Sequence, residues 1–474
     1  MQGVTVTTLG GGPAKLAITE LRPLQRNMRG KVCLRGDAGY DEARTIWNAM
    51  IDRRPGVVLR CACAEDVVAG VRFARDQHLL LAVRAGGHHI AGSAVCDGGL
   101  LLDLSPMRGV SVDTERREAC AEGGALLADV DQATQGFGLA VPLGINSTTG
   151  VAGLTLGGGY GWLTRRLGMT VDNLLAADLV IASGELIEVS GRREPELFWA
   201  VRGGGGNFGV ATAFRFRVHP VGPQVLAGLI VHPFARARDL LDTFRQVAAV
   251  APEELTCMAV IRKAPPLPFL PKHVHGQIVL TFAICHVGDA GEAERALAPL
   301  RSAPAPIADT VGPQPYAGWQ AAFDPLLAPG ARNYWKSHDL EQLDDGLLDA
   351  IVAHAAVLPT AESEVFLPSF GGAMGRVPSD AMAFPHRRMR FLLNVHARWR
   401  DPAADADCVA WARSFAAAVA SFGTGGAYVN FMPGDETDRL RGAFGANLPR
   451  LRALKARYDP ANQFRCNHNV PPAS

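Results

Sequence analysis

Residues 83–92 read VRAGGHHIAG and residues 147–173 read STTGVAGLTLGGGYGWLTRRLGMTVDN. The first stretch follows a strand-like run and joins three glycines to the histidine pair His88 and His89. Glycines let backbone N–H groups approach an anion closely, in the concave arrangement that a pyrophosphate needs. Imidazole is nucleophilic enough to form a bond to an electrophilic cofactor. This stretch is therefore typical either of a cofactor-binding loop or of a tight turn carrying two surface histidines.

The second stretch holds seven glycines among threonines and small apolar residues, followed by the helix-like run YGWLTRRLG. Small side chains permit close contact with a flat, extended ligand, and threonine hydroxyls and free N–H groups can bind phosphate or ribityl oxygens. The alternative is a glycine-rich structural crossover. The length and glycine density of the stretch favour the ligand-binding interpretation.

Working outward, the first half alternates short strands and helices, whereas residues 221–423 carry longer strands and fewer glycines. This distribution of strands and helices predicts an α+β protein in which residues 221–423 form a substrate lobe with an antiparallel sheet backed by helices. The last fifty residues return to glycine and asparagine and end in a helix. We therefore expect a discontinuous ligand-binding domain of residues 1–220 and 424–474, and a substrate domain of residues 221–423.

Residues 203–209, GGGGNFG, contain the spacing GxGxxG. A Rossmann fingerprint follows a strand and opens a helix, but this stretch follows a predicted helix and opens a predicted strand. Phosphate-loop, HExxH and nucleophile-elbow motifs are absent from the sequence. A nucleotide ligand must therefore be held by another fold.

Two further groups of residues are candidates for chemistry. Tyr428 and Asn430 alternate in YVNF, which predicts a strand with both side chains on one face. Tyrosine acts as a base only if its pKa falls well below about 10; a lone strand tyrosine is more often packing. The run RNYWKSHDL, residues 332–340, includes Lys336 and on spacing alone is more typical of a solvated strand or loop than of a site.

The composition excludes several classes of protein. The 474 residues carry 47 Lys and Arg against 46 Asp and Glu, which argues against a nucleic-acid partner. No apolar run is long enough for a membrane span, and the amino terminus has no secretory pattern, so a cytoplasmic protein is expected. Nine scattered cysteines suit reduced thiols, and no metal site is expected.

Together these segments resemble the FAD-linked oxidase family that includes berberine bridge enzyme and 6-hydroxy-D-nicotine oxidase, whose flavin fold is of the vanillyl-alcohol oxidase type. The resemblance covers nearly the whole chain, through the two glycine motifs, PELFWAVRGGGGNFGVAT, Trp399 with Asp401 and Pro402, YVNF and YDPANQFRCNHNVPP. It implies a two-lobed FAD-binding domain and an enzyme that oxidises a small molecule.

The resemblance also implies roles for particular residues. His88 would bond the flavin 8α-methyl group, as the single covalent link to FAD, and Tyr428 would be the catalytic base, assisted by Lys336. Arg84, Ala85, Gly86, Gly87, His89 and Gly92 would contact the pyrophosphate side, and Thr148, Thr149, Gly150, Gly153 and Thr155 would lie along the isoalloxazine and ribityl chain. Gly157, Gly158, Gly159, Tyr160 and Gly161 would complete this cradle, Asn173 and Val210 would approach the remainder of the cofactor, and Asn467 and Asn469 would close over the ring.

Three departures from the family pattern bear on the reaction. Asn146 stands where doubly linked members have cysteine, and Leu448 and His468 stand where tyrosine and glutamine are frequent, which leaves the substrate-side chemistry open. Val151 matches a position associated with oxygen access. The resemblance thus implies hydride transfer from a small alcohol, sugar or amine to flavin N5, with oxygen reduced to hydrogen peroxide. A dehydrogenase with another acceptor and a non-catalytic flavin-binding or small-ligand-binding protein are the alternatives; the oligomeric state is not readable from the sequence.

Overall fold

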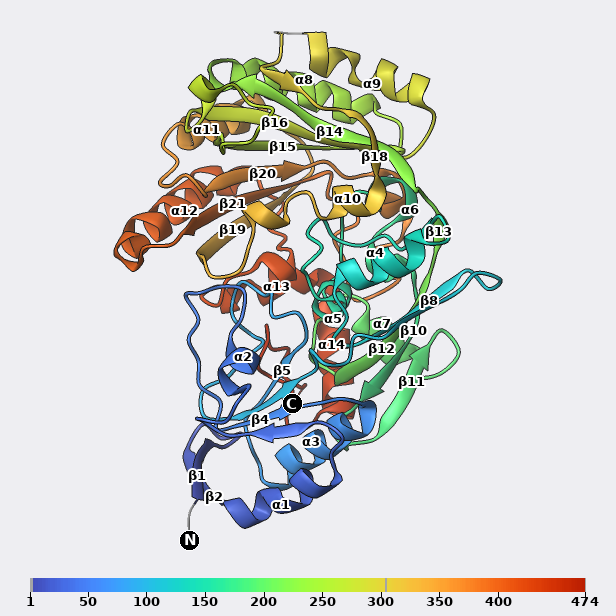
Figure 1. The fold of residues 1–474 in the computed structure, drawn as a ribbon, viewed down its shortest axis with the longest axis vertical. Helices are drawn as coiled ribbons and strands as arrows, with labels where there is room; N and C mark the ends of the chain where they lie inside the picture. The colour runs from blue at the N-terminus through green and yellow to red at the C-terminus, as the bar shows by residue number, and fades with distance from the viewer. Residues whose placement is uncertain (1–2, 303–304, 474) are drawn as a thin grey trace.

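The computed structural model describes residues 3–302 and 305–473. Two sheet-based halves are stacked along the long axis of the molecule (Figure 1). In one half, a four-stranded sheet has the order β3-β4-β6-β5, with β6 parallel to both of its neighbours. Its strands are β3 (Lys31–Cys33), β4 (Val57–Arg60), β5 (Leu81–Arg84) and β6 (Leu100–Asp103). The first glycine motif leaves the carboxyl end of β5.

A five-stranded antiparallel sheet with the order β11-β10-β12-β8-β7 completes this half. Its strands are β7 (Val110–Asp113), β8 (Glu118–Glu122), β10 (Leu174–Val180), β11 (Leu186–Ser190) and β12 (Val210–Arg217). Two small pairs join β1 (Gly3–Thr7) to β2 (Pro13–Ala17) and β9 (Leu139–Ala140) to β13 (His219–Pro220). The helices here are α1 (Ile18–Asn27), α2 (Tyr40–Arg44), α3 (Ala64–Asp76), α4 (Leu127–Gln135), α5 (Val151–Leu156), α6 (Thr164–Leu167) and α7 (Pro195–Val201).

The other half is built on an eight-stranded antiparallel sheet, counted over the described ranges, with the order β17-β14-β16-β15-β20-β21-β19 and β18 beside β14. Its strands are β14 (Gln224–Pro233), β15 (Leu255–Lys263), β16 (Ile278–His286), β17 (Ala308–Asp309), β18 (Gly312–Pro315), β19 (Arg332–Leu340), β20 (Glu364–Pro368) and β21 (Phe391–Trp399). Alternate residues along a strand face opposite sides of a sheet, so each long strand contributes to two different surfaces.

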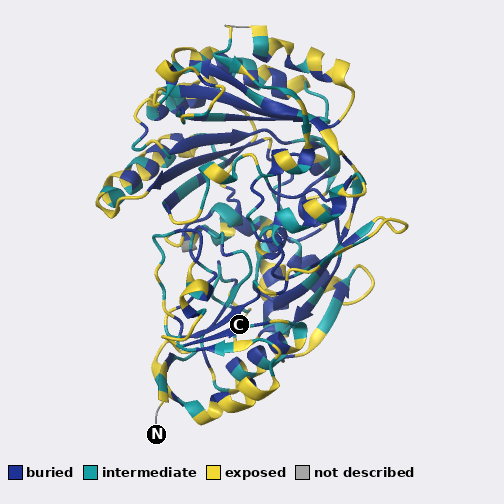
Figure 2. Cartoon of the chain, viewed as in Figure 1, coloured by how far each residue is buried: buried dark blue, intermediate teal, exposed yellow. Residues whose placement is uncertain are grey.

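One face of this sheet packs on helices. Ile230, Phe282 and Leu393 lie in one apolar cluster with Leu240 and Phe244 of α8. The helices of this half are α8 (Ala237–Val250), α9 (Ala290–Ser302), α10 (Tyr316–Gln320), α11 (Asp345–Ala355) and α12 (Asp405–Val419). Figure 2 shows the strands buried and the outer helix faces exposed. An antiparallel sheet backed by helices was expected for this segment and is confirmed; the domain boundaries stay a prediction.

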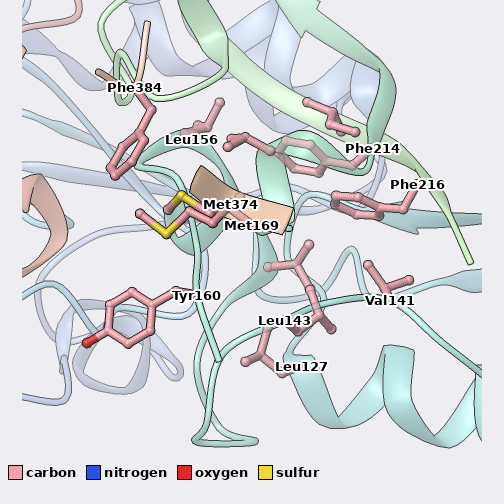
Figure 3. Packing of buried hydrophobic residues seen from close by; sticks show 14 of the residues in the cluster. Leu127, Val141, Leu143, Leu156, Tyr160, Met169, Phe214, Phe216, Met374 and Phe384 are labelled. Atoms are coloured by element: carbon pink, nitrogen blue, oxygen red, sulfur yellow. The ribbon is translucent and has the colours of Figure 1, made fainter. Parts of the chain in front are cut away.

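A second apolar cluster crosses from one half to the other. Met374 and Phe384, which come from the segment between β20 and β21, lie beside Leu156, Met169 and Tyr160 of the second glycine motif (Figure 3). Burial of such side chains stabilises the native state by about 1.5–3 kcal/mol each. The halves are therefore held together by packing, and the motif is fixed against both.

The carboxy-terminal segment returns to the first half through α13 (Leu440–Phe444) and α14 (Leu448–Tyr458). The ammonium of Lys455 is fully buried and donates to the carboxylate of Asp459 at 2.6 Å and to the carbonyls of Asn207 and Phe464. Among the described helices, none combines the length and apolar character needed to cross a membrane. The nine cysteines are unpaired in the structure.

Two local predictions were wrong. The run YGWLTRRLG is helical only over Thr164–Leu167, and the glycine-rich stretch before it contains α5, which the glycines concealed. YVNF is not a strand: Tyr428 precedes a 3-10 turn, Val429–Phe431. The turn is closed by i+3 bonds from the amides of Phe431 and Met432, so these backbone groups are satisfied locally and not by a neighbouring strand.

Candidate cofactor and substrate site

A cavity of about 380 Å³ lies between the glycine motifs and the face of the eight-stranded sheet that is turned away from its helices. Its walls come from residues 85–89, 144–156, 205–211 and 464–468, from β14, β15, β16, β20 and β21, and from the turn at Tyr428. The cavity is thus assembled from segments spread over the whole chain. Large, mainly apolar cavities with a few converging polar groups are the usual sites of small-molecule binding.

His88 lies on the wall of this cavity in a defined orientation. Its imidazole stacks on the indole of Trp47, with ring centroids 5.2 Å apart, and its Nε2 lies 3.0 Å from the hydroxyl of Thr148. Burial, together with the charge of Arg398, lowers the pKa of His88 to about 4. The imidazole is therefore neutral at physiological pH and keeps a nucleophilic lone pair.

The partners of Thr148 determine which nitrogen of His88 carries that lone pair. The Thr148 hydroxyl donates its hydrogen to the side-chain oxygen of Asn146 at 2.6 Å, so it can only accept from His88. Nε2 must then hold the ring proton, which leaves Nδ1 free as the nucleophile. Asn146, by accepting the Thr148 hydrogen, thus fixes the tautomer of His88.

His89 has different surroundings. Its Nε2 lies 3.3 Å from the carbonyl of Val429, and its ring centroid is 5.1 Å from that of His468. Burial, with the nearby His468 second, lowers the pKa of His89 to about 3. His89 therefore joins the first motif to the carboxy-terminal wall of the cavity.

Three glycines on the cavity wall leave their backbone open to a flat ligand. A Cβ on Gly153 would meet nothing within 4 Å, and one on Gly205 or Gly206 would meet only a side-chain amide at 3.6 and 3.9 Å. The side-chain oxygen of Asn467 is buried without a hydrogen-bond partner among the described residues. Open backbone, an unpaired amide oxygen and a neutral histidine suit an extended cofactor with a flat ring, such as FAD.

The structure brings about half of the predicted binding residues to the cavity wall. Those that line it are Ala85, Gly86, Gly87, His88, His89, Thr149, Gly150, Gly153, Tyr160, Val210 and Asn467, together with Tyr428. Thr148 touches His88 directly. Those outside the lining are Arg84, Gly92, Thr155, Gly157, Gly158, Gly159, Gly161, Asn173 and Asn469.

Several residues outside the lining hold the wall in place. Arg84 pairs with the buried Asp103 at 2.9 Å, and the amide of Asn173 donates to the carbonyls of Leu167 and Met169. A Cβ on Gly157 would collide with the Asn430 side chain at 2.1 Å. These residues act in the structure through protein contacts, and the glycine at 157 is required by close packing.

Tyr428 is fully buried on the cavity wall, and its hydroxyl oxygen accepts from the Gly159 amide and from the side-chain amide of Asn430, both at 3.1 Å. Burial raises the pKa of Tyr428 to about 12, although both hydrogen bonds oppose this rise. The lowered pKa that a tyrosine base requires is therefore not found in the protein without its ligands. Both neighbours donate to the phenol oxygen, so the hydroxyl hydrogen is free for another acceptor.

Lys336 is not brought to Tyr428. Its ammonium lies 2.9 Å from the carboxylate of Glu436 and 3.6 Å from that of Asp435, and it is absent from the cavity lining. The run that contains it was expected to be a solvated strand or loop, but it is β19, a largely buried strand. Its neighbour Trp335 does line the cavity.

Sequence reasoning missed other wall residues. Trp47 lies in a loop without a motif, and its indole N–H donates to the Leu327 carbonyl at 2.7 Å. Asn207, in the rejected GxGxxG stretch, bonds the carbonyls of Gly204 and His468 and the amide of Val470. The density of glycines around Asn207 was the only signal available for it. Within the described ranges, no cluster of His, Cys, Asp and Glu could hold a metal ion.

Comparison with known proteins agrees with this arrangement. An FAD binding domain family matches residues 55–190, and a berberine and berberine-like family matches residues 427–471. The FAD-linked oxidoreductase YgaK of Bacillus subtilis is 30% identical over 460 residues, covering 94% of this chain and 97% of its own. The (R)-6-hydroxynicotine oxidase of Paenarthrobacter nicotinovorans is 29% identical over 471 residues, covering 94% and 97%.

A solved structure shares the fold. The crystal structure of 6-hydroxy-D-nicotine oxidase from Arthrobacter nicotinovorans superposes with a TM-score of 0.83 at 29% identity, covering 94% of this chain and 99% of that one. The expected two-lobed flavin fold of the vanillyl-alcohol oxidase type is confirmed. The chain belongs to the FAD-linked oxidoreductases of the berberine bridge enzyme-like family, and it is an enzyme.

Proposed function

We propose that this enzyme is an oxidase that carries FAD on a single covalent bond to His88 and acts on a small organic substrate. The observation that supports the attachment most directly is the state of His88, which is neutral, oriented by Trp47 and Thr148, and left with a free Nδ1 lone pair on the cavity wall. A neutral nucleophile held in one orientation by its neighbours is suited to bond formation. Asn146 leaves His88 as the one attachment residue.

Bound FAD would supply a hydride acceptor at N5 and, once reduced, the electrons that convert oxygen to hydrogen peroxide. The protein would bind the cofactor along the open backbone of Gly153, Gly205 and Gly206. Asn467 would add its unpaired side-chain oxygen as a hydrogen-bond acceptor. The largely apolar wall would keep bulk water from the reacting groups.

Tyr428 would handle the O–H or N–H proton of the substrate. Its hydroxyl oxygen is fixed by Gly159 and Asn430, and both donors stabilise a phenolate when it forms. Because its pKa is about 12, most of the residue is protonated at neutral pH. Proton removal by Tyr428 should therefore become faster as the pH rises.

An oxidase is favoured over a dehydrogenase with another acceptor by the family resemblance at Val151, the first residue of α5, which is buried in the apolar core behind the cavity lining. The decisive experiment is a visible spectrum of the purified protein followed by turnover in air. We expect a yellow protein whose flavin is bleached anaerobically by substrate and which releases one hydrogen peroxide per substrate oxidised. Bleaching without peroxide in air would support the dehydrogenase.

A further inference from the structure

The face of the eight-stranded sheet that lines the cavity is divided into a polar part and an apolar part. Register pairs Arg262 with Glu364, Glu364 with His396, and His396 with Trp335, so these four residues form one continuous row across β15, β20, β21 and β19. All four line the cavity. We call this set the polar row.

The other end of the same face has no charged group. Its lining residues, here called the apolar wall, are Leu229 and Val231 of β14, Val279, Thr281 and Ala283 of β16, and Met258 and Val260 of β15. Thr281 contributes the one hydroxyl among them. The following loop adds Leu267, Leu270 and Phe269, an aromatic ring left 39% exposed. A hydroxyl buried against such a surface loses its water hydrogen bonds without replacement.

The polar row contains a salt bridge between opposite charges. The Glu364 carboxylate lies 3.0 Å from the Arg262 guanidinium, and its ionised form is favoured by that pairing. Burial lowers the pKa of His396, whose ring nitrogens face Glu364 at 3.3 Å and the Asn333 side-chain oxygen at 3.1 Å. The charge of the Arg262 guanidinium is thus already balanced by Glu364, so the row offers a carboxylate substrate N–H donors, Arg262 Nε and Trp335 Nε1, but no unpaired positive charge.

Unsatisfied polar atoms mark the same end of the cavity. Trp335 Nε1 and Asn394 Oδ1 are buried without a hydrogen-bond partner among the described residues. Asn394 lies two residues along β21 from His396, on the same face of the sheet, and lines the cavity beside Phe366. A donor and an acceptor are therefore available close to a neutral ion pair.

Ring contacts place the Trp335 and His396 end of the polar row at the His88 end of the cavity, whereas Arg262 lies opposite Val279 of the apolar wall. Trp335 lies 4.4 Å from His396 and 5.7 Å from Trp47, which stacks on His88. The apolar wall lies further across the sheet, on β15, β16 and β14. A substrate with its polar group beside the cofactor would therefore extend its body onto the apolar wall.

We infer that the substrate is an alcohol, or an amine in its neutral form, whose single polar group, the one oxidised, lies between Tyr428 and the Trp335 end of the polar row, which both contact the Phe431 ring. Its ring-bearing apolar body would lie on the apolar wall, and an oligosaccharide is excluded. This inference rests on the proposed function. It goes beyond it by selecting one chemical class among alcohols, sugars and amines. An oligosaccharide presents several hydroxyls along its length, and those beyond the first would meet the apolar wall.

Binding can be tested apart from turnover. The holoenzyme is titrated anaerobically with 3-phenylpropan-1-ol, 3-phenylpropanoate and cellobiose, following the visible flavin spectrum and heat of binding. We expect the alcohol to bind at least ~10-fold more tightly than either the carboxylate or the disaccharide. Equal or tighter binding of cellobiose, or of the carboxylate, would overturn the inference.

A pair of matched variants locates the binding surface. Val260→Thr adds a hydroxyl to the apolar wall and should weaken binding of the alcohol by ~10-fold. Val395→Thr makes the same change on the helix-packed face of the sheet and should leave the Kd unchanged. Equal effects of the two variants would show that the apolar wall is not where the body binds.

The same experiments distinguish failure of the proposed oxidase function from failure of the inferred substrate class. If the alcohol binds as expected but neither bleaches the flavin nor yields peroxide, the oxidase proposal is wrong for this substrate, while the assignment of the binding surface stands. If peroxide forms with cellobiose and not with any ring-bearing alcohol, the oxidase proposal stands and the substrate class is wrong.

Discussion

The backbones of Gly86 and Gly150 are in direct contact. A Cβ on Gly86 would lie 2.3 Å from the amide nitrogen of Gly150, and a Cβ on Gly150 would lie 2.4 Å from that of Gly86. The two glycine motifs therefore meet at a point where no side chain fits. This contact brings His88 to Thr148, the residue that orients it.

Gly150→Ala should separate the motifs. Overpacking of a buried contact costs about 1–3 kcal/mol, so the melting temperature should fall and the flavin content of the purified protein should drop. Gly191→Ala is the control, because a Cβ there would meet nothing within 4 Å. A Gly150→Ala protein as stable and as yellow as the wild type would contradict the contact.

His88→Ala should abolish covalent attachment. After acid precipitation, the wild-type pellet should keep its flavin, and the variant pellet should be colourless. His89→Ala is the matched control because His89 is the adjacent, partly buried histidine, whose Nε2 contacts the carbonyl of Val429. It should remain covalently flavinylated, and flavin retained by the His88→Ala pellet would refute the assignment.

Thr148→Val should slow flavin attachment without removing the nucleophile. The substitution keeps the shape of the side chain but removes the acceptor for His88 Nε2. Loss of one hydrogen bond corresponds to about 0.5–1.5 kcal/mol, or roughly a 2- to 10-fold slower appearance of covalent flavin when apoprotein is incubated with FAD. An unchanged rate, measured by acid precipitation over time, would show that Thr148 does not set the tautomer.

Tyr428→Phe should reduce the rate of flavin reduction by about 10²–10⁴-fold, the usual contribution of a positioned proton-transfer group. In the wild type, the rate should rise with pH, since the phenolate fraction increases toward the pKa of about 12. Stopped-flow bleaching between pH 6 and 10 measures both effects. Tyr334→Phe is the control, as its hydroxyl bonds Asp435 at 2.7 Å and not Tyr428; equal rates in the two variants would remove Tyr428 from the proton step.

Glu364 should make the protein sensitive to acid. The Arg262 charge holds the pKa of this buried carboxyl at about 2, against burial, while its ordinary value is 4.5. A lowered folded-state pKa stabilises the fold above about pH 4.5, and this contribution of about 3 kcal/mol is lost as the pH falls toward 2. Urea unfolding of Glu364→Gln should therefore depend less on pH between 5 and 2 than that of the wild type. The exposed Glu115→Gln should unfold like the wild type.

Part of the fold and of the site could be predicted from the sequence, because some backbone conformations require particular residues, which can be recognised locally in the sequence. Glycines in the two motifs identified part of the cavity wall, and longer strands identified the antiparallel sheet. Trp47 left no such trace, since its position depends on the Leu327 carbonyl, 280 residues further along the chain. The polar row was equally hidden, because it depends on cross-strand register and not on the order of residues within a strand.

The alternation in YVNF shows the limit of a short pattern. Four residues fit both a strand and a single turn, and the outcome depends on whether a neighbouring strand offers hydrogen bonds. Here, Tyr428 and Asn430 still converge, because the turn brings their polar ends within 3.1 Å. The shared strand face that was predicted is therefore wrong, and the turn brings the two side chains together instead.

The return of residues 427–471 to the glycine motifs has a consequence for how the protein is made. Lys455 reaches the Asn207 carbonyl, and Tyr428 reaches the Gly159 amide, so the last tenth of the chain builds part of the cavity wall. A ribosome that has translated both glycine motifs has therefore not yet supplied a complete binding site. Flavin loading must wait for the final segment to emerge, and a message truncated near its 3′ end would yield an apoprotein with an open, colourless site.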